Sequence, residues 1–342
     1  MYTLEHRPSI STNPHCSSRT ALETESSITF EGNHAPMTYL FQRLLQFIPV
    51  LVIVSFIVFG MARLAPVDPA IVMAGGRQTS PEVLEAIRER YHLKEPIIVQ
   101  YGYWATAALR GDLGESFRLK QDVRGMIAAR LPISLQLVGL AFIVATAIAL
   151  PLGILSAARE GTWIDALSSL VALIGVSAPV FFTGIVLVLV FAYTLGWLPA
   201  FGAGSIRNLI LPAIALGLNL VALTSRTMRS SLLEALETDY VRTAKAKGLS
   251  ETAVILRHGV RNAMLPVVTV LGLQLGFLLV GTVLVEYTFG LGGLGSLIVD
   301  GVQNSDYPIV QGTTMFVVVA FMVLNLLTDL VYAALDPRIR YG

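Results

Sequence analysis

The segment with the closest match to a chemical motif is glycine-rich and lies near the C-terminal end of the sequence. From Gly290 to Gly295 it reads GLGGLG, the spacing with which dinucleotide-binding proteins bring the backbone close to a pyrophosphate. That chemistry requires a preceding buried parallel strand, whereas this segment follows a long apolar stretch. We therefore interpret it as a turn between short helices and assign it no nucleotide.

The other residue types that carry chemistry are isolated from one another. The single cysteine, Cys16, lies in a polar N-terminal tail, and His258 stands beside Arg257 in a polar loop, where an interface role fits better than that of a base. No His, Cys or carboxylate cluster has metal-ligand spacing, and none of the four lysines follows glycines as in a phosphate-binding loop. The sequence predicts no catalytic residue, no metal site and no cofactor bound by this chain.

Composition indicates that the chain is built for a lipid bilayer. Hydrophobic residues make up 54% of the 342 residues and charged residues only 14%, far from the balance of a soluble domain. The net charge of +1 gives no general attraction to nucleic acid. Any functional signal must therefore come from where the charges lie.

Six apolar stretches are long enough to span a membrane, since about 20 helical residues cross a hydrocarbon core of about 30 Å. They are Leu44 to Met61, Leu131 to Ala157, Ala166 to Trp197, Asn208 to Ser225, Ala263 to Val285 and Ile309 to Thr328. The third is too long for one straight crossing, and Pro179 in its middle predicts a kinked or two-part helix, with a seventh span as the alternative. We expect an all-α integral membrane protein with six transmembrane helices.

The distribution of Lys and Arg predicts the orientation. The segment between the fourth and fifth spans is rich in both, whereas the segment between the fifth and sixth carries only Asp300 and Asp306. Because short basic loops remain in the cytoplasm, both termini are expected to be cytoplasmic. The basic stretch from Arg77 to Arg130 then falls outside and is the one element that opposes the rule.

The basic segment 226–262 carries start and stop signals for two short helices that meet at a sharp turn. Thr238 or Asp239 can cap the first helix, and Gly248 can end it in the left-handed conformation. Ser250 can cap the second, with Leu249 and Val254 as a hydrophobic staple. A solvated tether or a DNA-binding helix-turn-helix are the alternatives, but a tether needs no caps and nearby spans hold the unit against the membrane.

One face of the first helix is expected to contact another protein. Tyr240, Val241, Ala244 and Gly248 fall on that face, while Arg242 and Lys245 point elsewhere. Small side chains there would allow close approach by a partner.

Several motifs together resemble the permeases of ABC importers. RTAKAKGLS from Arg242 and RHGVRNAMLP from Arg257 are similar to the family's coupling motif. The general pattern begins Glu-Ala-Ala, however, and Pro266 lies further beyond Gly248 here than in the sugar-permease branch. These departures are typical of the first permease subunit in the dipeptide, oligopeptide and nickel branch. Further matches are DPA at Asp68, GDLGESF at Gly111, LPAIALG at Leu211, FGLGGLG at Phe289, DYPIVQG at Asp306 and the ending LDPRIRYG.

The resemblance covers Met37 to Gly342 and implies a type I importer permease in the cell inner membrane with cytoplasmic coupling helices. It implies as partners a second related permease, two ATPases that hold the ATP and magnesium, and an extracytoplasmic substrate-binding protein. It also implies that the ATPase docks on the segment Tyr240, Val241, Arg242, Thr243, Ala244, Lys245, Ala246, Lys247, Gly248 and Leu249.

Polar side chains inside the spans are costly in lipid and are candidates to line a translocation pathway. They are Asn219, Gln274, Asn325 and Asp329. The alternative is hydrogen bonding between helices, and Asp329 lies close enough to the cytoplasmic interface to pair with an arginine.

The remaining regions complete the domain plan. Residues 1–36 form a polar tail that is expected to be disordered and that could precede the natural start at Met37. Residues 37–342 form the permease domain, with an external region at 65–130 in which Ser80 and Pro81 begin a helix.

Three functions remain open from the sequence. The first is import of dipeptides or oligopeptides, with nickel or another metal chelate, a glycoside or an opine as the alternative cargo. The second is a transporter driven by an ion gradient, which inverted repeats and intramembrane charges would have favoured. The third is a membrane sensor that binds a cytoplasmic partner.

Overall fold

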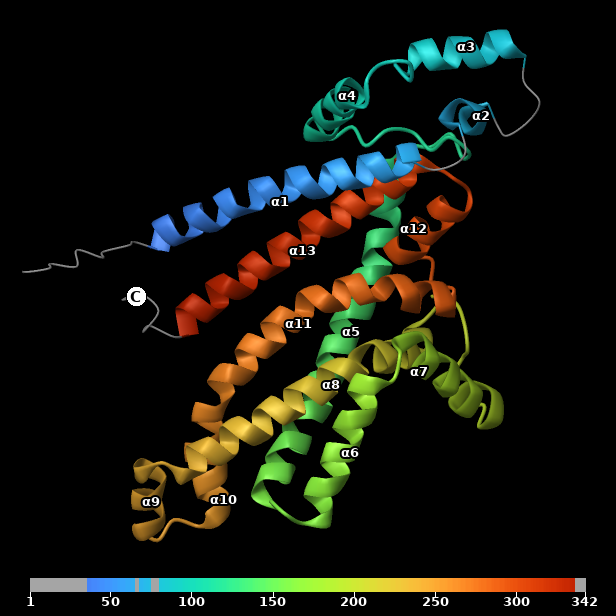
Figure 1. Ribbon diagram of the computed structural model, residues 1–342. Coiled ribbons are helices and arrows are strands. Elements are labelled where there is room, and N and C mark those ends of the chain that lie inside the picture. Colours follow the sequence, from blue (N-terminus) through green and yellow to red (C-terminus); the bar gives the residue numbers. More distant parts are fainter. Residues whose placement is uncertain (1–35, 65–67, 75–79, 336–342) are drawn as a thin grey trace, which may run out of the picture.

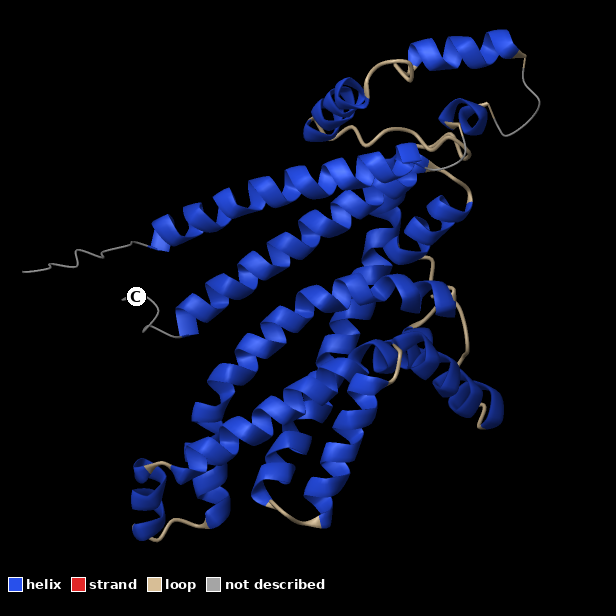
Figure 2. Cartoon of the chain, in the orientation of Figure 1, coloured by secondary structure: helices blue, strands red, loops and turns tan. Residues whose placement is uncertain are grey.

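The computed structural model describes residues 36–64, 68–74 and 80–335, which are almost entirely helical (Figures 1 and 2). The N-terminal tail and the LDPRIRYG ending after Leu335 lie outside the described residues. In chain order the helices are α1 Pro36–Leu64, α2 Pro69–Met73, α3 Pro81–Arg90, α4 Ile97–Leu109, α5 Val123–Ala158, α6 Trp163–Ser177, α7 Val180–Leu187, the π-helical η1 Val188–Thr194, α8 Ile206–Glu237, α9 Asp239–Ala246, α10 Glu251–Ala253, the π-helical η2 Val254–Gly259, α11 Val260–Phe289, α12 Leu294–Gln303 and α13 Tyr307–Leu335.

The spans agree with the sequence prediction. In the described part of the chain, five helices are long and apolar enough to cross a membrane. The pair formed by α6 and α7 with η1, bent by 112°, gives a sixth if its two parts count as one span. The bend falls at Pro179, because Ala178 before it takes an extended conformation and the proline cannot continue the hydrogen-bonded helix. The predicted break of the third apolar stretch at Pro179 is confirmed.

Several helices extend further than the apolar stretches that predicted them. α5 begins at Val123, and α8 continues to Glu237, so much of the basic segment 226–262 is helix that protrudes beyond the apolar span. Prolines at 132, 151, 212 and 266 lie inside helices without ending them, which bilayer proteins tolerate when neighbouring groups satisfy the freed backbone.

The core is built around α8, which packs between α5 and α6 on one side and α11 on the other. Glycines allow the backbones to approach closely. A Cβ at Gly217 would lie 3.0 Å from the Ala141 carbonyl of α5, and one at Gly175 would lie 2.8 Å from the Leu218 carbonyl of α8. Small residues at helix contacts are the usual means of association in lipid, where no hydrophobic force drives helices together.

The short elements gather at two opposite ends (Figure 1). α9 and α10 lie at the end where α1 begins and α13 ends, whereas α2, α3, α4 and α12 lie at the other end. The helix expected after Ser80 is present as α3. α2 is capped by Asp68, which accepts hydrogen bonds from Ala70 N and from Arg88 of α3 at 2.7 Å. The Arg88 guanidinium holds the pKa of Asp68 below its ordinary value.

Candidate functional site

The first candidate site is the polar unit between α8 and α11, here named the coupling module and comprising residues 238–259. Its predicted break is present, because Gly248 has φ +80° and Ser250 caps α10 by accepting a hydrogen bond from Ala253 N at 3.4 Å. Thr238 occupies the cap position of α9, but its hydroxyl donates to the Ala235 carbonyl at 2.6 Å instead of capping. The module thus begins where α8 ends.

The second short helix is not separate from the membrane span, which corrects the prediction of two short helices. α10 continues through the π-helical η2 directly into α11. The reason is close packing: a Cβ at Gly259 would lie 2.6 Å from Leu232 Cδ1 and 3.2 Å from Leu236 Cδ2 of α8. The span after the turn is therefore fixed to α8 through this π-helical turn.

The predicted contact face of α9 is wrong for two of its four residues, Val241 and Ala244, whereas the other two, Tyr240 and Gly248, are exposed. Val241 and Ala244 are buried within the chain, at 0% and 6% exposure, and pack with Val254 of η2 and Leu236 of α8. A short amphipathic helix beside two longer helices buries its apolar side against them first. These small side chains hold the module together and are not available to a partner.

Apart from the buried Val241 and Ala244, the surface of α9 is exposed and basic. Its exposed residues, together with those of the following turn, are Tyr240, Arg242, Thr243, Lys245, Ala246, Lys247, Gly248 and Leu249. Arg242 makes a 3.4 Å ion pair with Asp239, and both side chains are largely exposed. A partner would therefore meet a cationic helical surface with Leu249, 43% exposed, at its edge.

Polar contacts fix α9 to the start of α11. The Tyr240 hydroxyl accepts a hydrogen bond from Asn262 Nδ2 at 2.5 Å and lies 3.5 Å from the His258 carbonyl. His258 contributes its backbone oxygen to this contact. A displacement of α9 would thus be transmitted to both α8 and α11.

A brace at the same end of the molecule was not predicted from the sequence. Asp165 of α6, 8% exposed, accepts two hydrogen bonds from Arg229 of α8 at 2.7 and 2.8 Å, one from Ser156 Oγ of α5 at 2.6 Å and one from Gly161 N at 3.1 Å. Three helices are joined at one carboxylate. The available signal was an acidic residue at the start of an apolar span, where an unpaired charge is costly.

The four candidate pathway residues do not form one cluster. Asn219 of α8 and Gln274 of α11 face each other, with Gln274 Nε2 3.4 Å from Asn219 Oδ1. Asn325 of α13 packs against Gly276 of α11, where a Cβ would lie 3.0 Å from its Oδ1. Asp329 pairs with Arg43 of α1 at 3.3 Å, the arginine pairing that was the alternative interpretation.

The GLGGLG segment has a structural role in the fold. Glu286, fully buried near the end of α11, accepts hydrogen bonds from Gly295 N at 2.7 Å and Ser296 N at 3.4 Å, at the start of α12. Ser134 of α5 accepts from Leu294 N at 2.9 Å. A side chain at Gly293 would overlap the Glu286 carboxyl, so the glycine spacing admits a protein carboxyl where a nucleotide protein would admit a phosphate.

Two further motifs meet at the same end. Asp306, 1% exposed at the start of α13, accepts hydrogen bonds from Ser116 Oγ at 2.5 Å and from Phe117 N and Arg118 N at 3.2 Å. A Cβ at Gly312 would lie 2.8 Å from Val123. The GDLGESF and DYPIVQG motifs therefore form one joint between the external region and α13.

Comparison with known proteins gives the family. The family description "binding-protein-dependent transport system inner membrane component" matches residues 149–341, and that of its N-terminal part matches residues 37–138. The chain is 42% identical over 305 residues to the glutathione transport system permease protein GsiC of Escherichia coli strain CFT073, covering 89% of this chain and 99% of the relative. The corresponding protein of Salmonella typhimurium strain LT2 is 41% identical over the same length.

A solved structure shares the fold. The MetNI methionine ABC transporter in an inward-facing conformation matches with a TM-score of 0.53 at 16% identity, over 62% of this chain and 96% of that one. The membrane spans and the family matches thus define a multi-pass membrane subunit of the ABC permease type. The chain belongs to the family of binding-protein-dependent transport system inner membrane components, and it is the permease subunit of an ABC importer.

Proposed function

We propose that this permease imports short peptides, a class that includes the tripeptide glutathione. The observation that carries the proposal is its 42% identity, over nearly the whole length of both proteins, to a permease named for glutathione transport. In the complete complex it pairs with a second related permease, two ATPases and an extracytoplasmic binding protein. ATP and magnesium are held by the ATPases, and both termini of this chain face the cytoplasm.

The exposed face of α9 is the proposed ATPase contact. Arg242, Lys245 and Lys247 present positive charge at the end of the molecule where α1 begins and α13 ends. Because Val241 and Ala244 join α9 to α8 and η2, closure of the ATPase pair would move α8 and α11 together with α9. These are also the helices that carry Asn219 and Gln274, so movement at the module would reposition that pair of side chains relative to the other spans.

Substrate competition tests the peptide proposal. Proteoliposomes would contain the whole complex, with its binding protein added outside and ATP inside. Uptake of radiolabelled glutathione should be inhibited by other dipeptides and tripeptides and should survive a proton ionophore. Uptake of a nickel chelate that peptides fail to inhibit would refute the peptide class, and loss of uptake with the ionophore would favour an ion-gradient transporter.

A further inference from the structure

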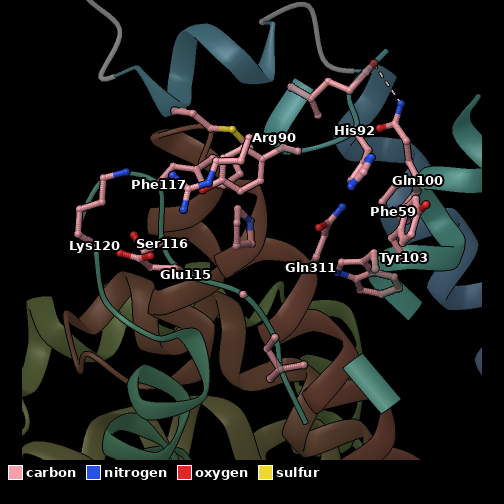
Figure 3. Close-up of a pocket in the computed structure, with 17 residues that line it drawn as sticks. Phe59, Arg90, His92, Gln100, Tyr103, Glu115, Ser116, Phe117, Lys120 and Gln311 are labelled. Carbon is pink, nitrogen blue, oxygen red and sulfur yellow. Dashed lines mark hydrogen bonds between the residues drawn. The ribbon is translucent and has the colours of Figure 1, made fainter. Parts of the chain in front are cut away.

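Two adjoining cavities lie at the end of the molecule opposite the coupling module. The first, of about 360 Å³, is an open pocket between α1, α4 and α13, and none of its described lining residues is charged. The second, of about 290 Å³, lies between the turn after α3, the segment after α4 and the start of α13 (Figure 3). Trp104 and Leu113 line both cavities, so the two lie side by side.

The second cavity has a polar and cationic lining. Arg90 and Lys120 both line it, with Glu115 as the one carboxylate among its described lining residues. Gln100 and Gln311 are only 7% and 6% exposed, and the Gln100 Oε1 is buried without a hydrogen-bond partner among the described residues. Figure 3 shows Gln311 reaching toward His92 on one side, and Arg90 and Lys120 on the other. This lining suits an anionic group that also carries hydrogen-bond donors.

The two cavities lie at different depths in the membrane, one at the depth of lipid acyl chains and the other at the depth of lipid headgroups. α1 and α13, which bound the apolar cavity, are membrane spans. α4 is an uncharged helix whose Ile98 and Leu109 are 74% and 88% exposed. Aromatic residues such as Tyr103 and Trp104 in a helix of this kind favour the boundary between lipid and water. The apolar cavity therefore lies at the level of acyl chains and the cationic cavity at the level of headgroups.

We propose that the two cavities bind one anionic phospholipid, with an acyl chain between α1, α4 and α13 and the headgroup between Arg90 and Lys120. This goes beyond the transport function proposed above. A soluble anion would use only the cationic cavity and leave the apolar one unfilled. A peptide segment would place unsatisfied backbone groups in the apolar cavity, which is costly. A lipid matches both cavities at once and would fix α4 to the spans.

Native mass spectrometry of the whole detergent-purified complex tests the headgroup. Phosphatidylglycerol should be retained more strongly than phosphatidylcholine. Arg90→Gln and Lys120→Gln should each weaken its retention about 5-fold, since a cation near a lipid surface contributes about 1 kcal/mol. Arg110→Gln removes an exposed cation that lines neither cavity and should change nothing. Equal retention of both lipids, or no effect of the two substitutions, would overturn the proposal.

Photochemical mapping on the unmodified protein tests the acyl chain. Phosphatidylglycerol with a diazirine near the end of one chain should label the stretch 101–109 and residues 315–319, and Ala108→Phe, which fills the cavity, should reduce that labelling. Excess glycerol phosphate should not compete. Labelling spread evenly over the spans, or competition by glycerol phosphate, would show no lipid site or a site for a soluble phosphate instead.

Discussion

At the scale of the residue, one buried carboxyl explains a motif that has the spacing of a nucleotide site. Glu286 accepts hydrogen bonds from two backbone N–H groups at the start of α12. Gly293 and Gly295 are glycines because a side chain at either would overlap Glu286 or the backbone of Val283. The helix N-terminus is satisfied from within the protein. The segment is therefore a joint between α11 and α12.

Two substitutions of Glu286 should distinguish its role as a hydrogen-bond acceptor for the start of α12 from simple space filling. Glu286→Leu leaves two buried N–H groups without an acceptor and should destabilise the protein by roughly 1–3 kcal/mol. Glu286→Gln keeps one carbonyl acceptor and should cost much less. Thermal unfolding of the purified complex, followed by tryptophan fluorescence, measures both. Equal loss in the two variants would contradict a capping role.

Local signals at single residues predicted local structure well. Gly248, Ser250 and Pro179 each acted where the sequence placed them, because caps and breaks depend on near neighbours. The direction of Val241 and Ala244 could not be predicted, since it depends on Leu236 and Val254 across a turn. Tertiary contacts, such as those of Glu286 with the start of α12 and of Asp165 with Arg229, could not be predicted, because they produce no periodic pattern in the sequence.

At the scale of the element, α8 is the helix on which the others depend. It packs against α5, α6 and α11, and its end becomes the coupling module. Asp165 ties its lower half to α5 and α6 through Arg229 and Ser156. α6 begins near the end of α8 that leads into the coupling module (Figure 1), so the Asp165 contacts fix α8 to α5 and α6 close to that end.

The brace predicts a difference between two arginines on α8. Arg229→Lys cannot make the paired hydrogen bonds that a guanidinium makes with a carboxylate and should destabilise the protein by about 1–2 kcal/mol. Arg226→Lys, an exposed position three residues earlier, should be neutral. Denaturant or thermal unfolding of the complex compares them. Equal stability of the two variants would contradict the prediction that the Asp165–Arg229 hydrogen bonds stabilise the protein.

At the scale of the whole molecule, the fold gathers its short elements at two opposite ends. One end carries α9, the brace, the start of α1 and the end of α13, and the other carries α2, α3, α4, the Asp306 joint and the two cavities. α8 and α11 run between the ends and meet at Asn219 and Gln274. The six-span plan was predictable because length and apolarity alone determine a span, whereas the joints at each end depend on tertiary contacts.

The central claim is that ATP hydrolysis drives uptake through the exposed face of α9, and coupled assays on one set of proteoliposomes test it most directly. Uptake and phosphate release would be measured together for the wild type, for Arg242→Glu with Lys245→Glu, and for the control Arg159→Glu, an exposed cation in the turn between α5 and α6. The account predicts normal coupling in the wild type and control. In the double variant it predicts a complex that reaches the membrane but loses at least about tenfold in uptake per ATP, because the reversed charges would oppose the contact that the basic face of α9 makes with the ATPase. Unchanged uptake per ATP in the double variant, with the ATPases still bound, would contradict it.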